Sequence, residues 1–266
     1  MPDETSNEKR GTNHPLKFSV IIPARYASSR FPGKPLADIG GKPMVVRVAD
    51  RAARSGAEEV LVATDHPGIA AACARHGHRA VMTRRSHASG TDRIAEVAAM
   101  RRYPGDRIVV NVQGDEPLIA PSLIRQVAAD LARHRDASMA TACHRISGAR
   151  ELADPNVVKV ALDRGGYALY FSRAPIPWAR DAFARGVSRV PPGLPAFRHL
   201  GIYACRVAFL RAFTRLKPAA IERFEALEQL RALAHGHRIH CTVTRAAPHP
   251  GVDTPADLKR LLRKLK

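Results

Sequence analysis

Short apolar runs alternate with amphipathic segments through the first half of the chain. The apolar runs are typical of buried strands and lie at 20–22, 60–63, 80–82 and 108–112. Segments with helical apolar spacing follow each of them, at 44–55, 68–75, 94–100 and 121–134. Strands that alternate with helices of this length predict βαβ units and a mainly parallel sheet, and therefore an α/β fold.

The second half of the chain shows a different pattern. Apolar runs at 138–143, 157–162 and 168–171 predict strands, and 163–166 (DRGG) is typical of a hairpin turn. The Arg-, Pro- and Gly-rich segment 178–195 predicts a long loop. The remaining pattern predicts strands at 201–205 and 239–243. It also predicts helices at 207–213, at 222–235 and after Asp253. We therefore expect an antiparallel subdomain at about 138–205, inserted before the main sheet resumes.

Composition places the chain among globular proteins. Its 266 residues are 45% apolar and 25% charged, which suits one large domain with a sizeable core. Residues 1–17 are polar without an apolar centre, so we expect a disordered tail rather than a secretory signal, followed by one domain over 18–266. No apolar run approaches the ~20 residues that span a bilayer, so no membrane partner is expected.

The cysteines bear on the cellular compartment. Cys73, Cys143, Cys205 and Cys241 lie far apart and form no CxxC pair. This spacing favours reduced core thiols in a cytoplasmic protein over a disulfide framework or a zinc site.

The net charge of +19, from 43 Lys and Arg against 24 Asp and Glu, raises the question of nucleic-acid binding. The basic residues are scattered, however, and aromatic residues make up only 5% of the chain, too few for a clear base-stacking platform. Small anionic substrates explain the charge as well. We expect no nucleic-acid partner.

The first strand runs into a loop with the chemistry of a polyanion site. The loop carries Arg25, Ser29, Arg30 and Lys34 among small residues and prolines. Guanidinium groups grip phosphate oxygens bidentately, lysine adds a mobile charge, and small residues expose backbone N–H groups. A solvated basic turn is the alternative, but ligands of α/β proteins bind at the carboxyl ends of strands.

Two further segments offer carboxylates. The apolar run at 108–112 ends in Gln113-Gly114-Asp115-Glu116, and a carboxylate at a strand exit suits Mg²⁺, although ordinary turn chemistry is an equal reading of that segment alone. Near the C-terminus, 254–257 (TPAD) fits a helix capping box. Asp253 lies just before this cap and could be a second metal ligand, although its spacing alone favours a structural role.

The chain resembles the CMP-Kdo synthetase (3-deoxy-manno-octulosonate cytidylyltransferase) family. The resemblance lies in segments that occur in the family's order: IPARYASSRFPGKPL, VATD, MTRRSHASGTDR, VNVQGDEP, YALYFSRAPIPW, FRHLGIYACR, ALEQLR and GVDTPADL. They cover nearly everything from Phe18 to the C-terminus. The first segment alone fits many nucleotidyltransferases, whereas FSRAPIPW and RHLGIY are more specific.

The resemblance implies a three-layer αβα fold of the nucleotide-diphospho-sugar transferase type, Mg²⁺ dependence and a homodimer. The implied reaction joins CTP and Kdo to give CMP-Kdo and pyrophosphate for lipopolysaccharide biosynthesis. An in-line attack of this kind needs placement and charge neutralisation but no covalent nucleophile. We therefore expect the metal, rather than a side-chain base, to activate the attacking sugar hydroxyl.

Site residues follow from the resemblance by motif. Arg25, Ser29, Arg30 and Lys34 should hold the triphosphate. Arg84, Ser89 and Gly90 should lie near the cytosine and ribose. Asp115 and Asp253 should hold Mg²⁺ and, with Arg25, Arg30 and Lys34, form the catalytic set. Arg173, His199, Tyr203, Glu228 and Gln229 should contact the sugar acid. Some relatives carry Gln where this chain has Ala88, so nucleobase selectivity must rest on its neighbours.

Other interpretations remain open for these residues and for the whole chain. Without the resemblance, Arg173 could pair with an acid, His199 could be a core histidine, and Glu228 could be an ordinary helix-surface residue. A CMP-sialic acid synthetase would share the phosphate loop and differ on the sugar side. A dinucleotide-binding dehydrogenase is disfavoured because no GxGxxG follows the first strand.

Overall fold

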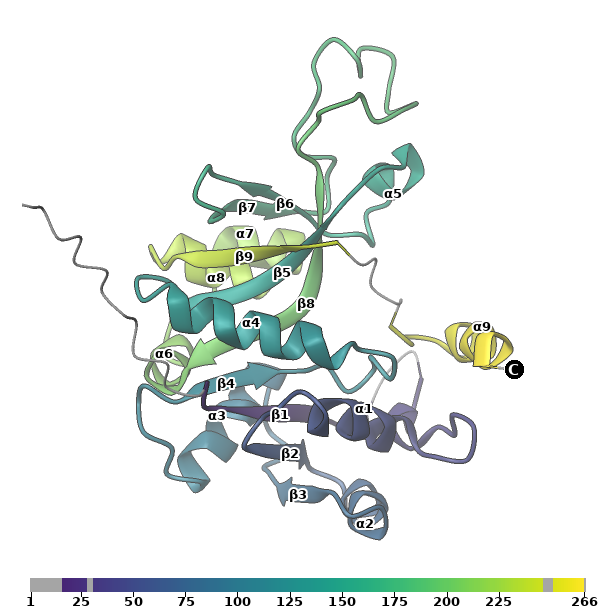
Figure 1. The fold of residues 1–266 in the computed structure, drawn as a ribbon, viewed down its shortest axis with the longest axis vertical. Helices are drawn as coiled ribbons and strands as arrows, with labels where there is room; N and C mark the ends of the chain where they lie inside the picture. The colour runs from purple at the N-terminus through teal and green to yellow at the C-terminus, as the bar shows by residue number, and fades with distance from the viewer. Residues whose placement is uncertain (1–15, 28–30, 246–250, 266) are drawn as a thin grey trace, which may run out of the picture.

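The computed structural model describes residues 16–27, 31–245 and 251–265. Most of the predicted N-terminal tail, together with Ser29 and Arg30 of the predicted phosphate loop, therefore lies outside the described residues. The predicted α/β class is confirmed by a central sheet with helices on both faces (Figure 1).

The main path of the sheet contains seven strands in the order β3-β2-β1-β4-β8-β5-β9. Their bounds are β1 (Phe18–Ala24), β2 (Glu59–Thr64), β3 (Arg79–Met82), β4 (Ile108–Asn111), β5 (Met139–Arg145), β8 (Phe197–Arg206) and β9 (Ile239–Thr244). Strand β8 runs antiparallel to both of its neighbours β4 and β5, whereas the other adjacent pairs are parallel. The mainly parallel sheet predicted from the first half is confirmed.

A hairpin leaves this path in the second half of the chain. It consists of β6 (Lys159–Leu162) and β7 (Ala168–Ser172), and β6 also pairs with one end of β8. The short helix α5 (Ala149–Ala153) lies between β5 and the hairpin in sequence. Strands β5 and β8 fall inside the predicted subdomain 138–205 but are members of the main sheet. The hairpin is thus the part that departs from it.

Two hydrophobic cores lie on the two faces of the sheet, as a three-layer fold requires. On one face, α1 (Met44–Ala53), α2 (Pro67–Arg75) and α4 (Pro121–Arg133) pack on Val20 and Ile22 of β1. On the other face, α3 (Gly90–Met100), α6 (Val207–Phe213) and α8 (Gln229–Ala234) pack on Ile21. The alternation within one strand supplies both faces because successive side chains point in opposite directions.

The remaining helices lie outside these layers. A 3₁₀ turn η1 (Lys34–Leu36) follows the phosphate loop, and α7 (Ala220–Glu225) precedes α8. Helix α9 (Pro255–Leu265) stands apart from the sheet in Figure 1. Its Leu261 belongs to a small hydrophobic cluster with Ile39 and Met44. Within the described part of the chain, no helix is long and apolar enough to cross a membrane.

Two helix predictions need correction. The segment 222–235 is two short helices rather than one, because Ala226 adopts a left-handed conformation with φ 51°. Arg231 on α8 reaches back to Glu222 on α7, an ion pair that holds the two pieces together. The predicted helix 94–100 begins four residues earlier, at Gly90, where a capping box joins Ser89 and Asp92.

Candidate active site

An open cleft of about 1010 Å³ lies at the carboxyl ends of the parallel strands β1 and β4. Its walls come from the loop after β1, from η1, from the start of α3, from the loop after β4 and from the segment before α9. The lining residues are Pro23, Ala24, Arg25, Lys34, Pro35, His87, Ala88, Ser89, Gly90, Arg93, Gln113, Gly114, Asp115 and Asp253. This is the sheet edge at which ligands of α/β proteins bind.

Lys34 joins the two predicted metal ligands inside the cleft. Its Nζ donates to Asp115 Oδ2 at 2.7 Å and to Asp253 Oδ1 at 3.2 Å. The Lys34 side chain is only 15% exposed. Two carboxylates from distant parts of the chain therefore converge on one cationic group, which is the arrangement expected of a cation site.

Local structure places both carboxylates. Asp115 follows Gly114, where a Cβ atom would lie 3.0 Å from the Pro23 carbonyl, so glycine permits the close approach of the β1 and β4 exits. The backbone N–H of Val252 donates to the Asp115 carbonyl at 2.9 Å and ties the two segments together. The backbone N–H of Asp253 donates to Asp257, the acid of the predicted capping box with Thr254, and that box is confirmed.

Glu116, next to Asp115 in the sequence, has a carboxyl that resists ionisation. Burial raises the pKa of its carboxyl to about 7, and repulsion from Asp115 acts in the same direction, against a smaller opposing effect of Arg198. The site therefore already holds negative charge beside a group that resists ionisation. A bound cation would relieve this repulsion.

The start of α3 forms another wall. Ser89 accepts from the Asp92 backbone N–H at 3.2 Å, while Asp92 accepts from the Ser89 backbone N–H at 3.2 Å. The capping box is thus complete. The amino end of an eleven-residue helix carries partial positive charge, which favours an anionic ligand in the cleft.

The predicted nucleotide-binding residues are brought together only in part. Arg25, Lys34, Ser89, Gly90 and Asp115 line the cleft, and Arg25 is exposed. Arg84 does not line it among the described residues. Its guanidinium instead pairs with Glu96 at 3.1 Å beside a surface hollow that shares His87 with the cleft. Ser29 and Arg30 lie outside the described residues.

Three cleft residues with polar side chains, His87, Arg93 and Gln113, were not predicted from the sequence. His87 is bonded to Glu96 at 2.5 Å, and the nearly buried Arg93 pairs with Asp65 at 2.9 Å. Gln113 donates to Asn111 at 3.3 Å. Asn111 and Gln113 alternate with valines at the end of the β4 run, a period-2 pattern that indicates two polar side chains on the same face of the strand.

A second cavity of about 480 Å³ adjoins the same elements. Tyr203, Glu228 and Gln229 of the predicted sugar-side set line it, together with Thr91, Asn111 and seven largely apolar residues: Ile94, Val109, Met139, Cys205, Phe209, Leu210 and Phe213. Thr91 follows the cleft residue Gly90, and Asn111 accepts a hydrogen bond from the cleft residue Gln113. The walls of the two cavities are therefore built from neighbouring residues.

Glu228 is the polar centre of this second cavity. Thr91 Oγ1 donates to its Oε2 at 2.6 Å. Its other oxygen, Oε1, is buried and has no hydrogen-bond partner among the described residues. Burial also raises the pKa of the nearby Tyr203 hydroxyl well above its usual value, and the Glu228 carboxylate adds to this shift. A buried acceptor without a donor indicates a place for a ligand hydroxyl or a water.

His199 and Arg173 are not placed in either cavity among the described residues. His199 is a buried histidine whose Nε2 is 3.0 Å from Thr141 Oγ1, and burial lowers its pKa to about 3. Arg173 donates to the backbone carbonyls of Glu225 at 2.7 Å and of Pro155 at 3.0 Å. In this state its guanidinium holds loops together.

The chain is similar to known nucleotidyltransferases over almost its whole length. The sequence pattern of the family described as Cytidylyltransferase matches residues 19–239. A solved structure of CMP:2-keto-3-deoxy-manno-octonic acid synthetase complexed with CTP is 43% identical, with a TM-score of 0.85, and the match covers 94% of this chain and 98% of that one.

Two more distant structures support the fold alone. A cytidylyltransferase from Leptospira borgpetersenii serovar Hardjo-bovis (strain JB197) is 15% identical with a TM-score of 0.60, covering 94% of this chain and 86% of that one. A nucleotidyl transferase from Methanothermobacter is 17% identical with a TM-score of 0.57, covering 94% of this chain and all of that one, 100%.

Proposed function

This chain belongs to the cytidylyltransferase family, and we propose that it transfers the CMP group of CTP to Kdo, giving CMP-Kdo and pyrophosphate for lipopolysaccharide biosynthesis. The observation that carries the proposal is the meeting of Asp115, Asp253 and Lys34 in a cleft walled by Arg25 and the amino end of α3. The 43% identity to CMP:2-keto-3-deoxy-manno-octonic acid synthetase supports Kdo as the sugar acid.

The donor set in the cleft fits Mg²⁺. Asp115 and Asp253 supply hard oxygen ligands that already converge on one point, now taken by the Lys34 ammonium. Mg²⁺ is usually held by one or two carboxylates together with substrate phosphates. When bound, the ion would lower the pKa of the attacking hydroxyl and neutralise charge on the α-phosphate.

Residues of the chain would then orient the nucleotide and stabilise the charge that develops during the reaction. The sugar hydroxyl gives up its proton to solvent as its oxygen forms a bond to the α-phosphorus of CTP, and the bond from that phosphorus to the pyrophosphate oxygen breaks. Lys34, freed from the carboxylates, would follow the charge that develops on the departing pyrophosphate. Arg25, Ser89 and Gly90 would hold the nucleotide in line for the attack, and we propose that Ser29, Arg30 and Arg84 assist in this.

We place the sugar acid in the second cavity, near the cleft. The unpartnered Glu228 Oε1 is suited to accept from a sugar hydroxyl, and Tyr203 and Gln229 lie on the same wall. Arg173 would contact the sugar carboxylate after release from the backbone carbonyls that it now holds. His199, buried behind Tyr203 at a ring distance of 5.3 Å, would contact the sugar only through a rearrangement of that wall.

We also propose that two copies of the chain associate through the side that carries the β6–β7 hairpin, within the predicted unit 138–205. Leu169 on β7 and Phe224 on α7 are 63% and 93% exposed, and Ser172 Oγ donates to Glu225 where these elements meet. Such apolar exposure indicates a covered surface. Sedimentation should give a dimer that Phe224→Ser weakens; a wild-type monomer would refute the proposal.

A reducing compartment suits this chain. Cys73, Cys143, Cys205 and Cys241 are all buried and free of disulfides, as predicted. We propose that the protein is located in the cytoplasm. Fractionation of the native host tests this, and finding the protein in the membrane or secreted fraction would contradict it.

The catalytic role of the acidic pair is tested by Asp253→Asn. We expect turnover to fall by about a hundredfold or more, as for loss of a major electrostatic contribution in the transition state. Calorimetry should still detect CTP binding, and added Mg²⁺ should not restore the rate. Asp181→Asn, which changes a 98% exposed carboxylate, is the matched control. Near-normal turnover of Asp253→Asn would contradict the proposal.

A further inference from the structure

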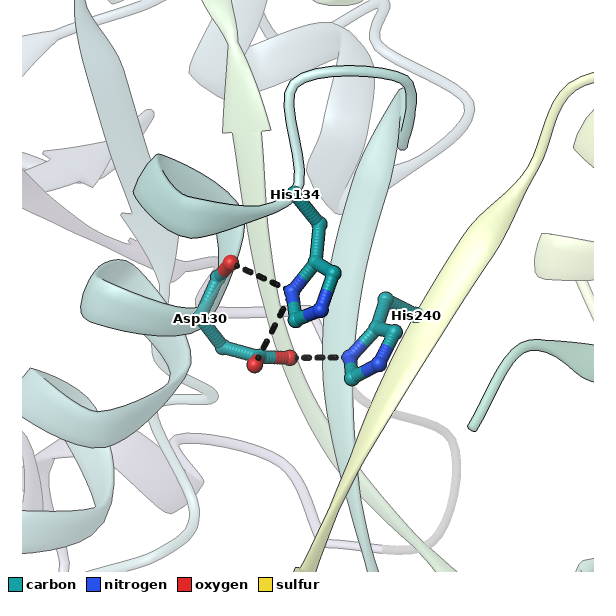
Figure 2. A group of neighbouring side chains, drawn as sticks. All are labelled: Asp130, His134 and His240. Atoms are coloured by element: carbon teal, nitrogen blue, oxygen red, sulfur yellow. Dashed lines mark hydrogen bonds and ion pairs between the residues drawn. The ribbon is translucent and has the colours of Figure 1, made fainter. Parts of the chain in front are cut away.

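A cluster of three potential ligands lies at the end of α4, among residues that line neither the cleft nor the second cavity. Asp130 is in the last turn of α4, His134 follows the helix directly, and His240 comes from the neighbouring strand β9 (Figure 2). One ligand atom from each residue can be chosen so that all three lie within 4.8 Å of one another.

The carboxylate of Asp130 faces both imidazoles. His240 Nδ1 lies 2.6 Å from Oδ2, and His134 Nδ1 lies 3.3 Å from Oδ1 (Figure 2). The Asp130 side chain is only 3% exposed. A buried carboxylate needs hydrogen-bond donors or positive charge beside it, and the largely exposed Arg133 lies 3.2 Å from Oδ1.

The second nitrogen of His240 defines which atom is available to a ligand. Its Nε2 lies 3.1 Å from the backbone carbonyl oxygen of Gly165, which can only accept. Nε2 must therefore carry a hydrogen. If the ring is neutral, its Nδ1 then has a lone pair that points at the Asp130 carboxylate. Two facing acceptors require a cation between them, either a proton or a metal ion. A histidine that donates its other N–H to a backbone carbonyl is the usual arrangement of a metal ligand.

We propose that Asp130, His134 and His240 form a binding site for a divalent transition-metal ion, with Zn²⁺ the best chemical match. Two imidazoles and one carboxylate suit Zn²⁺, whereas Mg²⁺ prefers oxygen ligands alone. The His134 side chain is 31% exposed, so that side of the cluster admits the ion and a water as fourth ligand. The site is separate in chemistry and in residues from the Mg²⁺ site of the cleft.

Metal binding requires a defined local rearrangement. The two imidazoles are stacked with ring centres 3.6 Å apart and an interplanar angle of 13°, so one ion cannot lie in both ring planes as they stand. With metal–ligand bonds of about 2.0–2.1 Å, tetrahedral ligand atoms lie roughly 3.3 Å apart. His134 Nδ1 also lies 3.0 Å from the Asp130 backbone carbonyl oxygen, which can only accept, so this nitrogen carries its hydrogen in the metal-free protein. Metal binding therefore requires the partly exposed His134 ring to turn until a nitrogen lone pair faces the carboxylate, and the His240 pair must open.

The metal would act as a structural clamp. Bound at the three residues, it would join the end of α4 to β9, and through the His240–Gly165 hydrogen bond to the turn of the β6–β7 hairpin. Tyr167 of the same turn packs edge-on against both imidazoles, at 6.0 Å from His134 and 5.0 Å from His240. We therefore expect Zn²⁺ to raise the melting temperature of the protein.

The test is titration of chelator-treated, full-length protein with Zn²⁺ in the presence of saturating Mg²⁺, followed by Co²⁺ as a spectroscopic probe. We expect one tight Zn²⁺ per chain, a rise in melting temperature, and the visible absorption of tetrahedral Co²⁺. His134→Ala, which removes a partly exposed side chain, and His240→Gln should each weaken binding by about tenfold to a hundredfold.

The controls separate this site from others. His76→Ala changes an exposed histidine outside the cluster and should leave Zn²⁺ affinity unchanged. Asp253→Asn alters the cleft and should also leave it unchanged. Absence of Zn²⁺ binding, or equal affinity in wild type, His134→Ala and His240→Gln, would overturn the proposal, because a proton alone would then occupy the cluster.

Discussion

Lys34 has two incompatible tasks in the proposed reaction. In the free protein its ammonium lies between Asp115 and Asp253, where it competes with any metal ion for the same oxygens. During turnover it must leave them for the phosphates. The ion pair therefore keeps the acidic residues in place before the substrates arrive, at some cost in metal affinity.

This competition predicts opposite effects of one substitution. Lys34→Met should strengthen binding of Mn²⁺, used as a probe for Mg²⁺, to the nucleotide-free protein by about tenfold or more, since a nearby charge is worth on the order of 1–4 kcal/mol. The same change should reduce turnover. Lys42→Met, which breaks a more exposed pair with Asp50, is the control. Weaker Mn²⁺ binding by Lys34→Met would show that the lysine does not occupy the metal position.

His199 predicts a pH dependence of stability. Its folded-state pKa of about 3 lies below the usual 6.5 because burial disfavours the imidazolium. Its contribution is therefore complete above about pH 6.5 and is lost as the pH falls towards 3, by up to about 1.4 kcal/mol per pH unit. In His199→Asn, the decline of the unfolding free energy between pH 6 and pH 4, measured in urea, should be shallower by about one proton. An unchanged slope would contradict this account.

At the scale of elements, the break between α7 and α8 positions Glu228, which we propose to contact the sugar. Because the chain turns at Ala226, Glu228 comes to the start of α8, where it meets Thr91 of α3. In a continuous helix over 222–235, Glu228 would lie at a different position relative to Thr91. The apolar pattern predicted that continuous helix, since nothing in an alanine signals a left-handed conformation.

The break predicts an unusual ranking of substitutions. At φ 51° a β-branched side chain clashes with the backbone, so Ala226→Val should lower the unfolding free energy by about 1–2 kcal/mol. Ala226→Gly should keep or raise it, since glycine tolerates this conformation. Ala71→Val, on the exposed side of α2, should cost less than 1 kcal/mol. Equal effects of valine at 71 and 226, measured by chemical denaturation, would contradict a strained turn.

Capping shows which element boundaries the sequence does reveal. The motif at 254–257 predicted the start of α9 correctly because both partners of the capping box are local. The similar box of Ser89 and Asp92 lies before a stretch without apolar periodicity, and the start of α3 was missed. Local hydrogen bonding can thus be predicted when it is sought, whereas periodicity alone locates only the buried turns of a helix.

At the scale of the whole molecule, the alternation of strands and helices predicted the parallel half of the sheet. It did not predict the order of the strands in the sheet. β8 enters between β4 and β5, and this insertion brings Tyr203 beside Asn111. The convergence of Asp115 and Asp253 likewise depends on contacts between distant segments. Motif resemblance predicted both residues as metal ligands, while their shared contact with Lys34 required the structure.

The most direct measurement of the central claim is pyrophosphate release from CTP and Mg²⁺ with Kdo, N-acetylneuraminate or no sugar added. We expect release only when CTP, Mg²⁺ and Kdo are all present, with CMP-Kdo formed in equal amount. Release with N-acetylneuraminate but not Kdo would contradict the sugar-side assignment of Glu228 and Tyr203. No release with either sugar acid, from folded protein, would contradict the proposed function itself.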